Sequence, residues 1–335
     1  MIGYYVHHHG LGHLRRFEAI AAHLRTSVTG LSSLAAPPSW RGDWVVLPRD
    51  DEPSTGPDPT AGGLLHWAPR GHPGLRSRMA ALASWIDQAR PALVVTDVSV
   101  EVTVLARLMG VPVAVMAMAG DRTDPPHRLA YDLADGLIAS WPSAAAAPDW
   151  PTGWHAKTAY VGAFSRFDDR VPPAVGRGRE VLVLWGAGGD DVSDNDRAAA
   201  QAATPGWRWT YRLGGAGGEC GDSDDSGAGG DVWADLVAAH VVVVHGGNNA
   251  VAEVAAARRP AVVVAQRRPF DEQVHRARAV HRAGIATGLE RWPAAEAWPA
   301  LLDEAVARDA ERWSLWSPGD GARRAATELE RLAGP

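Results

Sequence analysis

The stretch that decides the fold is V-V-V-V-H-G-G-N-N-A-V-A-E, residues 241–253. Four consecutive valines predict a buried strand, because a strand covered on both faces is apolar at every position. The Gly246-Gly247 pair then allows a sharp turn, and Asn248 begins a segment with helical spacing. Backbone N–H groups at the start of such a helix can bind a diphosphate. The stretch therefore predicts a strand–turn–helix unit of a parallel sheet, with an anion site at its turn.

The same unit recurs along the chain, where short apolar runs alternate with segments of helical spacing. Strands are predicted at 2–6, 28–31, 44–47, 92–96, 111–116 and 136–139, and then at 180–185, 207–212, 241–244 and 261–265. Helices are predicted at 14–24, 75–89, 192–203, 232–239, 249–258, 271–283 and 295–309. Continuous apolar strands alternating with helices are typical of α/β proteins with parallel sheets.

The chain is long enough for about two domains, since it has 335 residues. The segment 165–179 is rich in Pro, Arg and Gly, which is typical of a linker. We assign 1–165 to an N-terminal domain, 166–179 to the linker and 180–335 to a C-terminal domain whose last helix could pack back on the first. Residues 214–231 are mainly Gly, Asp and Ser and predict a surface insertion.

Composition excludes several classes of function. A net charge of −6 argues against a general nucleic-acid binder. Cys220 is the single cysteine, which excludes an internal disulfide and a multi-cysteine zinc site. Lys157 is the only lysine, so a lysine Schiff base or a Walker motif has almost no candidate residue. No apolar run approaches the roughly 18 residues of a membrane span, and no signal peptide is evident, so we expect a cytoplasmic protein.

Histidines crowd the first predicted turn, which reads H-H-H-G-L-G-H at residues 7–13. His13 lies where a helix begins, and an imidazole titrates near neutral pH, as a general base for a hydroxyl requires. The alternative is that these histidines pack or cap the turn, which we prefer for His7 and His8. No separate acidic ligand is indicated, so we predict no metal. Arg15 stands where a dinucleotide fingerprint would have its third Gly, which argues against a nicotinamide enzyme.

Three Gly-rich stretches, in this order along the chain, resemble one known family. Residues 245–253, followed by Pro260 and by Asp-Glu-Gln at 271–273, look like the donor-binding signature of inverting GT-B glycosyltransferases. The resemblance is to family 28, typified by the peptidoglycan N-acetylglucosaminyltransferase that makes lipid II, and to the related family 1. Residues 10–13 are similar to the acceptor-side loop ending in His, and 184–189 to the turn that opens the C-terminal domain.

The resemblance implies a GT-B fold, in which two Rossmann-like domains with parallel sheets face each other across a cleft. It implies inversion at the anomeric carbon, with a nucleotide-sugar donor and no catalytic metal. Glu253 would then hold the ribose, and Asp271 and Gln273 the donor sugar. The other donor-binding residues would be Gly186, Gly188, Gly189, His245, Gly246, Gly247, Asn248 and Asn249, while Gly10 and Gly12 would lie on the acceptor side. The family often has Pro shortly after the N-terminal His, where this chain has Arg15 and Arg16.

Asp97 is a candidate partner for His13, because it ends a predicted strand and some family members orient the catalytic His with an acidic residue nearby. A carboxylate bonded to an imidazole fixes its tautomer and stabilises its cation. Asp97 could equally cap the next helix, and Asp121 is a weaker candidate for the orienting role. Residues 64–86 mix aromatic, apolar and basic side chains. Packing, acceptor contact through Trp67 and Met79, and membrane-surface contact are all open for this segment.

We therefore expect an inverting, metal-independent hexosyltransferase that moves a sugar from a UDP-sugar, or second a dTDP-sugar, to an acceptor hydroxyl. No cofactor is expected beyond the donor, and no nucleic-acid partner. Peripheral contact with the inner membrane surface stays open, as does a role in cell-wall or natural-product glycosylation. The alternatives are an epimerase of the same fold, which would need acidic residues poised for elimination, and a non-catalytic nucleotide-sugar-binding subunit, which would not need His13.

Overall fold

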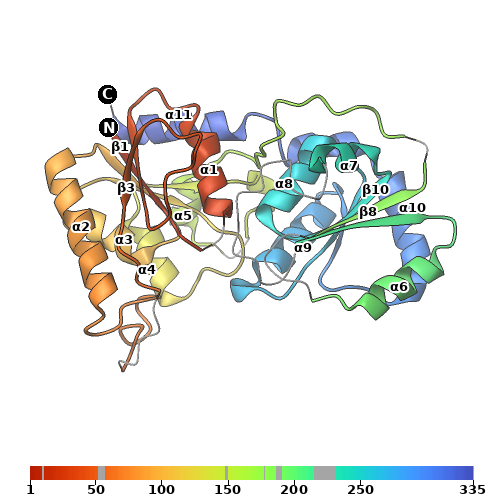
Figure 1. Ribbon diagram of the computed structural model, residues 1–335, viewed down its shortest axis with the longest axis horizontal. Helices are drawn as coiled ribbons and strands as arrows, with labels where there is room; N and C mark the ends of the chain where they lie inside the picture. The colour runs from red at the N-terminus through yellow and green to blue at the C-terminus, as the bar shows by residue number, and fades with distance from the viewer. Residues whose placement is uncertain are drawn as a thin grey trace.

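Two parallel sheets, one from each half of the chain, form the protein (Figure 1). The computed structural model describes residues 1–9, 11–51, 57–147, 150–176, 178–185, 191–214 and 231–334. The predicted insertion at 214–231 lies almost entirely outside these residues. The two sheets confirm the α/β class.

The first sheet has the order β3-β2-β1-β4-β5-β6-β7. Its strands are β1 (Ile2–Val6), β2 (Val28–Ser32), β3 (Asp43–Val46), β4 (Leu93–Asp97), β5 (Val113–Met116), β6 (Gly136–Ala139) and β7 (Thr158–Tyr160). The helices of this half are α1 (Gly12–Ala21), α2 (Pro73–Ala89), α3 (Val100–Leu108), α4 (Pro125–Leu133) and α5 (Thr152–Ala156), with a 3₁₀ turn η1 (Ser143–Ala145). Strands β1 and β4 are adjacent in parallel register, with Val6 opposite Asp97. The loops after both strands therefore meet at one edge of the sheet.

The second sheet has the order β12-β11-β10-β8-β9. Its strands are β8 (Glu180–Trp185), β9 (Arg208–Leu213), β10 (Val241–His245), β11 (Ala261–Val264) and β12 (Thr287–Leu289). The helices are α6 (Asp194–Ala203), α7 (Val232–Ala238), α8 (Asn248–Ala257), α9 (Glu272–Arg282) and α10 (Trp298–Ala307), with 3₁₀ turns η2 (Pro269–Asp271), η3 (Ala295–Ala297) and η4 (Ala310–Leu315). Strand β10 is central, and each of its four valines is buried.

Each predicted strand has a counterpart in the structure, with ends that differ by at most two residues. Strands β7 and β12, which have three residues each and lie at sheet edges, were not predicted. A strand this short carries no hydrophobic period that a sequence pattern could reveal.

The last helix, α11 (Gly321–Ala333), follows the second half in the sequence but packs on the first half, against α1 and β4 (Figure 1). Its buried side chains join Phe17 and Ile20 of α1 in one apolar cluster. Gly136 of β6 allows this approach, because a Cβ there would come within 2.6 Å of Leu332 Cδ1. The chain therefore begins and ends in the same half, and we keep 166–179 as its proposed linker.

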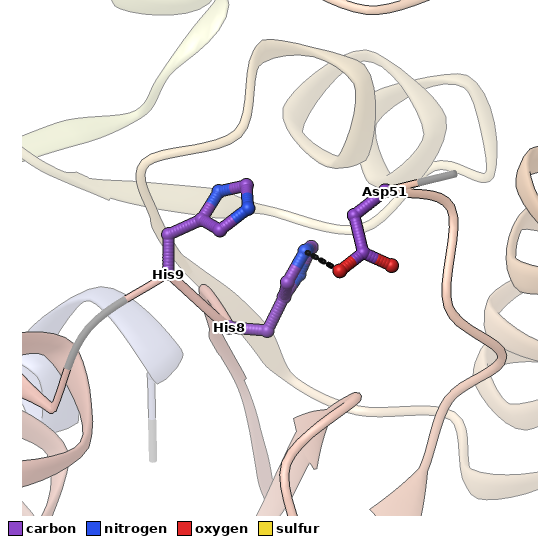
Figure 2. A group of neighbouring side chains, drawn as sticks. All are labelled: His8, His9 and Asp51. Carbon is purple, nitrogen blue, oxygen red and sulfur yellow. Dashed lines mark ion pairs between the residues drawn. The ribbon is translucent and has the colours of Figure 1, made fainter. Parts of the chain in front are cut away.

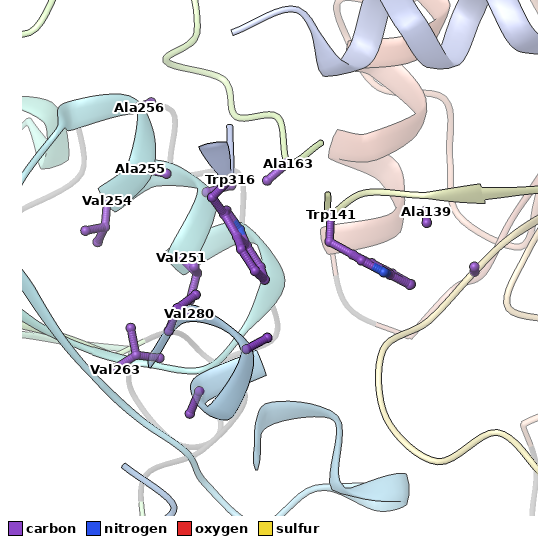
Figure 3. Packing of buried hydrophobic residues seen from close by; sticks show 14 of the residues in the cluster. Ala139, Trp141, Ala163, Val251, Val254, Ala255, Ala256, Val263, Val280 and Trp316 are labelled. Carbon is purple, nitrogen blue, oxygen red and sulfur yellow. The ribbon is translucent and has the colours of Figure 1, made fainter. Parts of the chain in front are cut away.

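A second apolar cluster contains residues of both halves (Figure 3). Trp141 follows β6 in the first half, whereas Val251 of α8, Val280 of α9 and Trp316 belong to the second. Burial of apolar surface between the sheets stabilises one arrangement of the two halves.

Within the described residues, no helix is both long enough and apolar enough to cross a membrane.

The packing of α11 predicts the effect of one substitution. Leu329 is fully buried in the cluster with α1. We expect Leu329→Ala to lower the free energy of unfolding by about 2–5 kcal/mol, because it leaves a cavity in a packed core. Urea denaturation measures the change. Leu108→Ala is the control, since Leu108 is 79% exposed and its loss should change stability by at most about 0.5 kcal/mol. Equal stabilities of the two variants would contradict this packing.

Candidate active site

A buried carboxylate lies at the centre of the N-terminal part of the site. Asp97 ends β4 and is fully buried. Its Oδ1 atom lies 2.9 Å from Nδ1 of His13 and 2.9 Å from Nη1 of Arg16. His13 is the second residue of α1, and Arg16 follows one turn later on the same helix. The structure thus brings together the two residues predicted as catalytic, and adds an arginine.

The charge of Asp97 fixes the protonation of the histidine ring. Burial raises the pKa of this carboxyl group, but Arg16 and His13 outweigh burial and hold the pKa below its usual value. An ionised carboxylate can only accept hydrogen bonds, so Nδ1 of His13 carries the proton and Nε2 presents its lone pair. Such a ring can accept a proton at Nε2.

Two alternatives were open: that Asp97 caps the next helix, and that Asp121 orients His13. The geometry matches neither. The N-cap of α3 is Ser99, whose side chain accepts a hydrogen bond from the Val102 N–H group at 3.2 Å. Asp121 accepts hydrogen bonds from the backbone N–H and the hydroxyl of Thr123, at 2.9 and 2.6 Å. Asp121 therefore shapes its own turn.

The ring of His13 lies beside that of His7, which in turn contacts His8 and His9. The ring centroids of His7 and His13 are 5.7 Å apart, and His7 stacks on His8 at 4.9 Å. Burial, reinforced by the neighbouring imidazoles, lowers the pKa of His7 to about 3. Burial, and then the charge of Arg78, lower the pKa of His8 to about 4. Both rings are thus neutral at pH 7 and pack at the turn, as the packing alternative predicted.

His8, His9 and Asp51 are close enough to share a metal ion (Figure 2). His8 Nε2 lies 3.9 Å from Asp51 Oδ2. Two guanidinium groups oppose a cation there: Arg49 binds both oxygens of Asp51, at 3.2 and 3.0 Å, and Nη2 of Arg78 lies 3.4 Å from His8 Nδ1. A donor at Nδ1 also places the ring proton on Nε2, where a metal would bind.

A second such group consists of His66, Asp124 and His127. Asp124 contacts His127 Nδ1 at 2.6 Å and His66 Nε2 at 3.3 Å. Nη1 of Arg122 lies 3.3 Å from the other ring nitrogen of His127. As at the first group, a positively charged guanidinium lies beside the possible metal ligands and opposes a cation there. The absence of a catalytic metal stays a prediction.

In the second half, the turn after β10 explains its two glycines. A Cβ on Gly246 would lie 2.9 Å from the Gln273 Cβ, and one on Gly247 would lie 2.3 Å from Cε1 of His245. The His245 ring therefore folds over the turn, where its Nδ1 accepts a hydrogen bond from the Gly247 N–H group at 3.0 Å. That N–H group is occupied, so an anion at this turn would use the first N–H groups of α8, which have no partner within the helix.

A pocket of about 470 Å³ is lined by side chains of both halves. The two helices that contribute to it, α1 and α8, face each other in Figure 1. The walls of the pocket come from α1, the segment 164–166 and α8: Arg15, Arg16, Glu18, Ala19, Phe164, Ser165, Arg166, Asn248, Asn249 and Glu253. Glu253 accepts a hydrogen bond from Arg166 Nε at 3.0 Å. A Cβ on Gly12 would lie 3.3 Å from Asn249 Nδ2, so the starts of the two helices are close neighbours.

The predicted sugar-binding residues lie where a loop that docks on the first half leads into α9: Asp271 precedes the helix, and Gln273 is its second residue. Asp121 N–H donates to the Phe270 carbonyl at 3.0 Å, and the Arg122 guanidinium lies 4.5 Å from the Phe270 ring centroid. Phe270 and Asp271 both have positive φ angles, 61° and 50°. Asp271 is exposed, whereas Gln273 is buried and its Oε1 accepts from the Gln266 N–H group at 3.0 Å. Gln273 therefore shapes this loop.

The two side chains predicted to contact the acceptor, Trp67 and Met79, both have partners within the first half. Trp67 donates through Nε1 to the Asp50 carbonyl at 2.8 Å. Met79 packs against the cluster that contains Tyr5 and Leu82. Acceptor contact by Trp67 and Met79 stays a prediction.

Comparisons with known proteins agree with this architecture. Residues 231–311 match the model of the glycosyltransferase family 28 C-terminal domain. The solved structure of the kitacinnamycin glycotransferase has a TM-score of 0.68 at 19% identity, over 99% of this chain and 98% of that one. The calicheamicin glycosyltransferase CalG4 has a TM-score of 0.65 at 18% identity, over 99% of this chain and 98% of that one. MurG of Acinetobacter baumannii has a TM-score of 0.64 at 14% identity, over 98% of this chain and 99% of that one. No curated protein sequence matches the chain.

The chain has the fold of the GT-B glycosyltransferases. The residues that match the family 28 C-terminal domain model include the stretch 241–253. The resemblance stated from the motifs is thus confirmed.

Some predicted residues of this GT-B chain lie outside the described residues: Gly10, Gly186, Gly188 and Gly189. Four arginines near the contact between the two halves have no role predicted from the sequence: Arg16, Arg122, Arg166 and Arg276. For Arg16 a signal existed, because Arg15 and Arg16 follow soon after His13, where the family often has Pro. The others carry no motif, and only the folded chain brings them to the cleft.

His245 predicts how the stability of this GT-B protein depends on pH. Burial, and then Arg268 and Arg276, lower the pKa of His245 from 6.5 to about 4. Between these values the unfolded chain binds a proton that the folded chain does not, so stability falls as the pH falls from 6.5 to 4. We expect His245→Gln to reduce this slope by up to about 1.4 kcal/mol per pH unit. Urea denaturation from pH 4.5 to 7 measures it, with exposed His23→Gln as control. An unchanged slope would contradict the assignment.

Proposed function

We propose that the protein is an inverting glycosyltransferase that transfers a sugar from a nucleotide sugar, UDP-linked first and dTDP-linked second, to an acceptor hydroxyl. One observation carries the proposal: the His13–Asp97 pair, on the first half, lies next to a pocket whose opposite wall holds Asn248, Asn249 and Glu253. A base from one domain thus adjoins polar groups suited to a nucleotide from the other. This arrangement favours group transfer over the epimerase and over a non-catalytic subunit.

The proposed chemistry is a single displacement. His13 Nε2 takes the proton from the acceptor hydroxyl while its Nδ1–H group donates to Asp97. The acceptor oxygen bonds to the anomeric carbon as the bond from that carbon to the diphosphate breaks, so the configuration inverts. Asp97 stabilises the imidazolium that forms, and stays ionised.

The leaving diphosphate would bind at the start of α8. This helix has ten residues and no side-chain cap at its first turn, so its free N–H groups and positive dipole end face incoming charge. Fixed donors aimed at a developing charge are often the largest single contribution to catalysis. The reaction needs no metal in this scheme, because the helix and nearby guanidinium groups supply the positive charge.

The names of similar structures, and not the site itself, support a proposal for the acceptor class. Two similar structures bear the names of natural-product glycosyltransferases, for kitacinnamycin and calicheamicin, and a third is MurG. We propose a natural-product acceptor, with a cell-wall acceptor second.

The base assignment predicts a large kinetic effect. We expect His13→Ala to reduce kcat by about 10²-fold or more with an almost unchanged Kd for the nucleotide, because the ring moves a proton and does not hold the donor. Asp97→Asn should also reduce kcat, since the amide no longer fixes the tautomer. Transfer assays with a panel of UDP- and dTDP-sugars measure both. A folded His13→Ala protein with near-normal turnover would remove the base assignment.

The ribose assignment predicts a loss of affinity. A carboxylate that accepts hydrogen bonds from ribose hydroxyls makes charge-assisted bonds, which are stronger than neutral ones. We expect Glu253→Gln to weaken nucleotide binding by about 1.5–3 kcal/mol. Calorimetry with UDP and dTDP measures it. Glu18→Gln is the matched control, because Glu18 lines the same pocket from α1 and should leave affinity unchanged. Equal effects of the two substitutions would take Glu253 out of the ribose site.

A further inference from the structure

We propose that Arg16 has two partners: it holds Asp97 with one side of its guanidinium group, and it binds the diphosphate of the donor with the rest. The inference rests on the proposed function, and it assigns to the first half a contact with a donor that the second half would mainly hold.

The geometry gives Arg16 unused hydrogen-bonding capacity at the pocket. Its side chain is only 6% exposed, and Nη1 donates to Asp97 Oδ1 at 2.9 Å. Within the described part of the chain its Nε–H group is buried and has no hydrogen-bond partner. A buried donor left unpaired carries a desolvation cost that a ligand acceptor would remove. The same side chain lines the pocket opposite Asn248 and Asn249, the first two residues of α8. An anion seated at the start of α8 would therefore lie within the reach of a guanidinium from α1.

The charges of the site require such an anion during the reaction. Before proton transfer, Arg16 and Asp97 cancel, and His13 is neutral in the form that acts as a base. When His13 takes the acceptor proton, this buried group acquires a net positive charge. In the same step the bond between the anomeric carbon and the phosphate oxygen breaks, and its electron pair leaves on the diphosphate. Arg16 contacts the carboxylate that holds the new imidazolium, and it lines the pocket that would hold the diphosphate. Its positive charge opposes the protonation of His13 unless the negative charge of the diphosphate offsets it.

A second buried guanidinium supports the anion site from behind. Arg276 of α9 is 4% exposed, donates to the Gly246 carbonyl, and reaches Asn248 Oδ1 at 3.4 Å. Burial lowers the pKa of Arg276 to about 10; Glu272 opposes this shift, and Arg16 adds to it. Two buried cations from different halves thus repel each other across the cleft. A diphosphate between α1 and α8 would relieve that repulsion, and would draw the two halves together.

The test compares ligands with and without phosphates. Calorimetry would measure the Kd of UDP and uridine, and of dTDP and thymidine, for the wild-type protein and for Arg16→Gln. We expect Arg16→Gln to weaken the diphosphate by about tenfold or more and to leave the nucleoside unchanged, because a charge-assisted contact is lost only where phosphate is present. Glu253→Gln should weaken nucleoside and nucleotide alike. Arg323→Gln, an exposed arginine on α11, controls for the loss of one positive charge.

Arg16→Gln leaves a buried carboxylate without its cation and could destabilise the fold. The double variant Arg16→Gln/Asp97→Asn avoids this, because it removes both charges, and its melting temperature reports whether it folds. A selective loss of diphosphate affinity in the double variant supports the inference. Unchanged diphosphate affinity, or an equal loss for nucleoside and nucleotide, would overturn it while the proposed function stands. If neither nucleotide binds the wild-type protein, the proposed function itself fails.

Discussion

The buried carboxylate of Asp97 is the interaction on which the site depends. It ends the strand next to β1, and the loop after β1 leads directly into α1, so the parallel register of two strands brings the carboxylate to the first turn of that helix. One oxygen then holds both His13 and Arg16. A buried charge is tolerated only when it is paired, and here the pairing also fixes the position of the proposed base.

The two halves are joined more extensively than a flexible linker would require. The loop that contains Phe270 docks on the turn that contains Arg122, and a shared apolar cluster lies beneath α8 and α9. Gly120 lies at the closest approach: its φ angle is +98°, and a Cβ there would lie 2.2 Å from the Phe270 carbonyl oxygen. The contact fixes one side of the cleft, whereas the pocket between α1 and α8 lies where polar side chains face each other.

Positive charge from both halves converges on this cleft. Arg16 and Arg122 belong to the first half, and Arg276 to the second; Asp97 pairs with Arg16, whereas Glu272, Asp124 and Asp121 lie near Arg122. Arg16 and Arg276 are close enough to act on each other near the start of α8, and this favours an anionic ligand there because desolvated charges interact strongly. The net charge of −6 hides this feature, because acidic residues elsewhere on the chain more than offset it.

The sequence by itself determined the α/β class, the positions of the long strands and the family resemblance, because these depend on local patterns: apolar runs, helical spacing, and glycines at the turns. Within the stretch 241–253 the reason for a glycine is itself local, because the His245 ring occupies the space that a Cβ on Gly247 would need. Only the tertiary structure decided that Asp97 contacts His13 and does not cap α3, that Gln273 shapes a loop, and that Arg16 and Arg276 approach the same helix start. These contacts join residues 80 or more positions apart, or depend on which face of a helix is buried, and no local pattern encodes the distance between two such side chains.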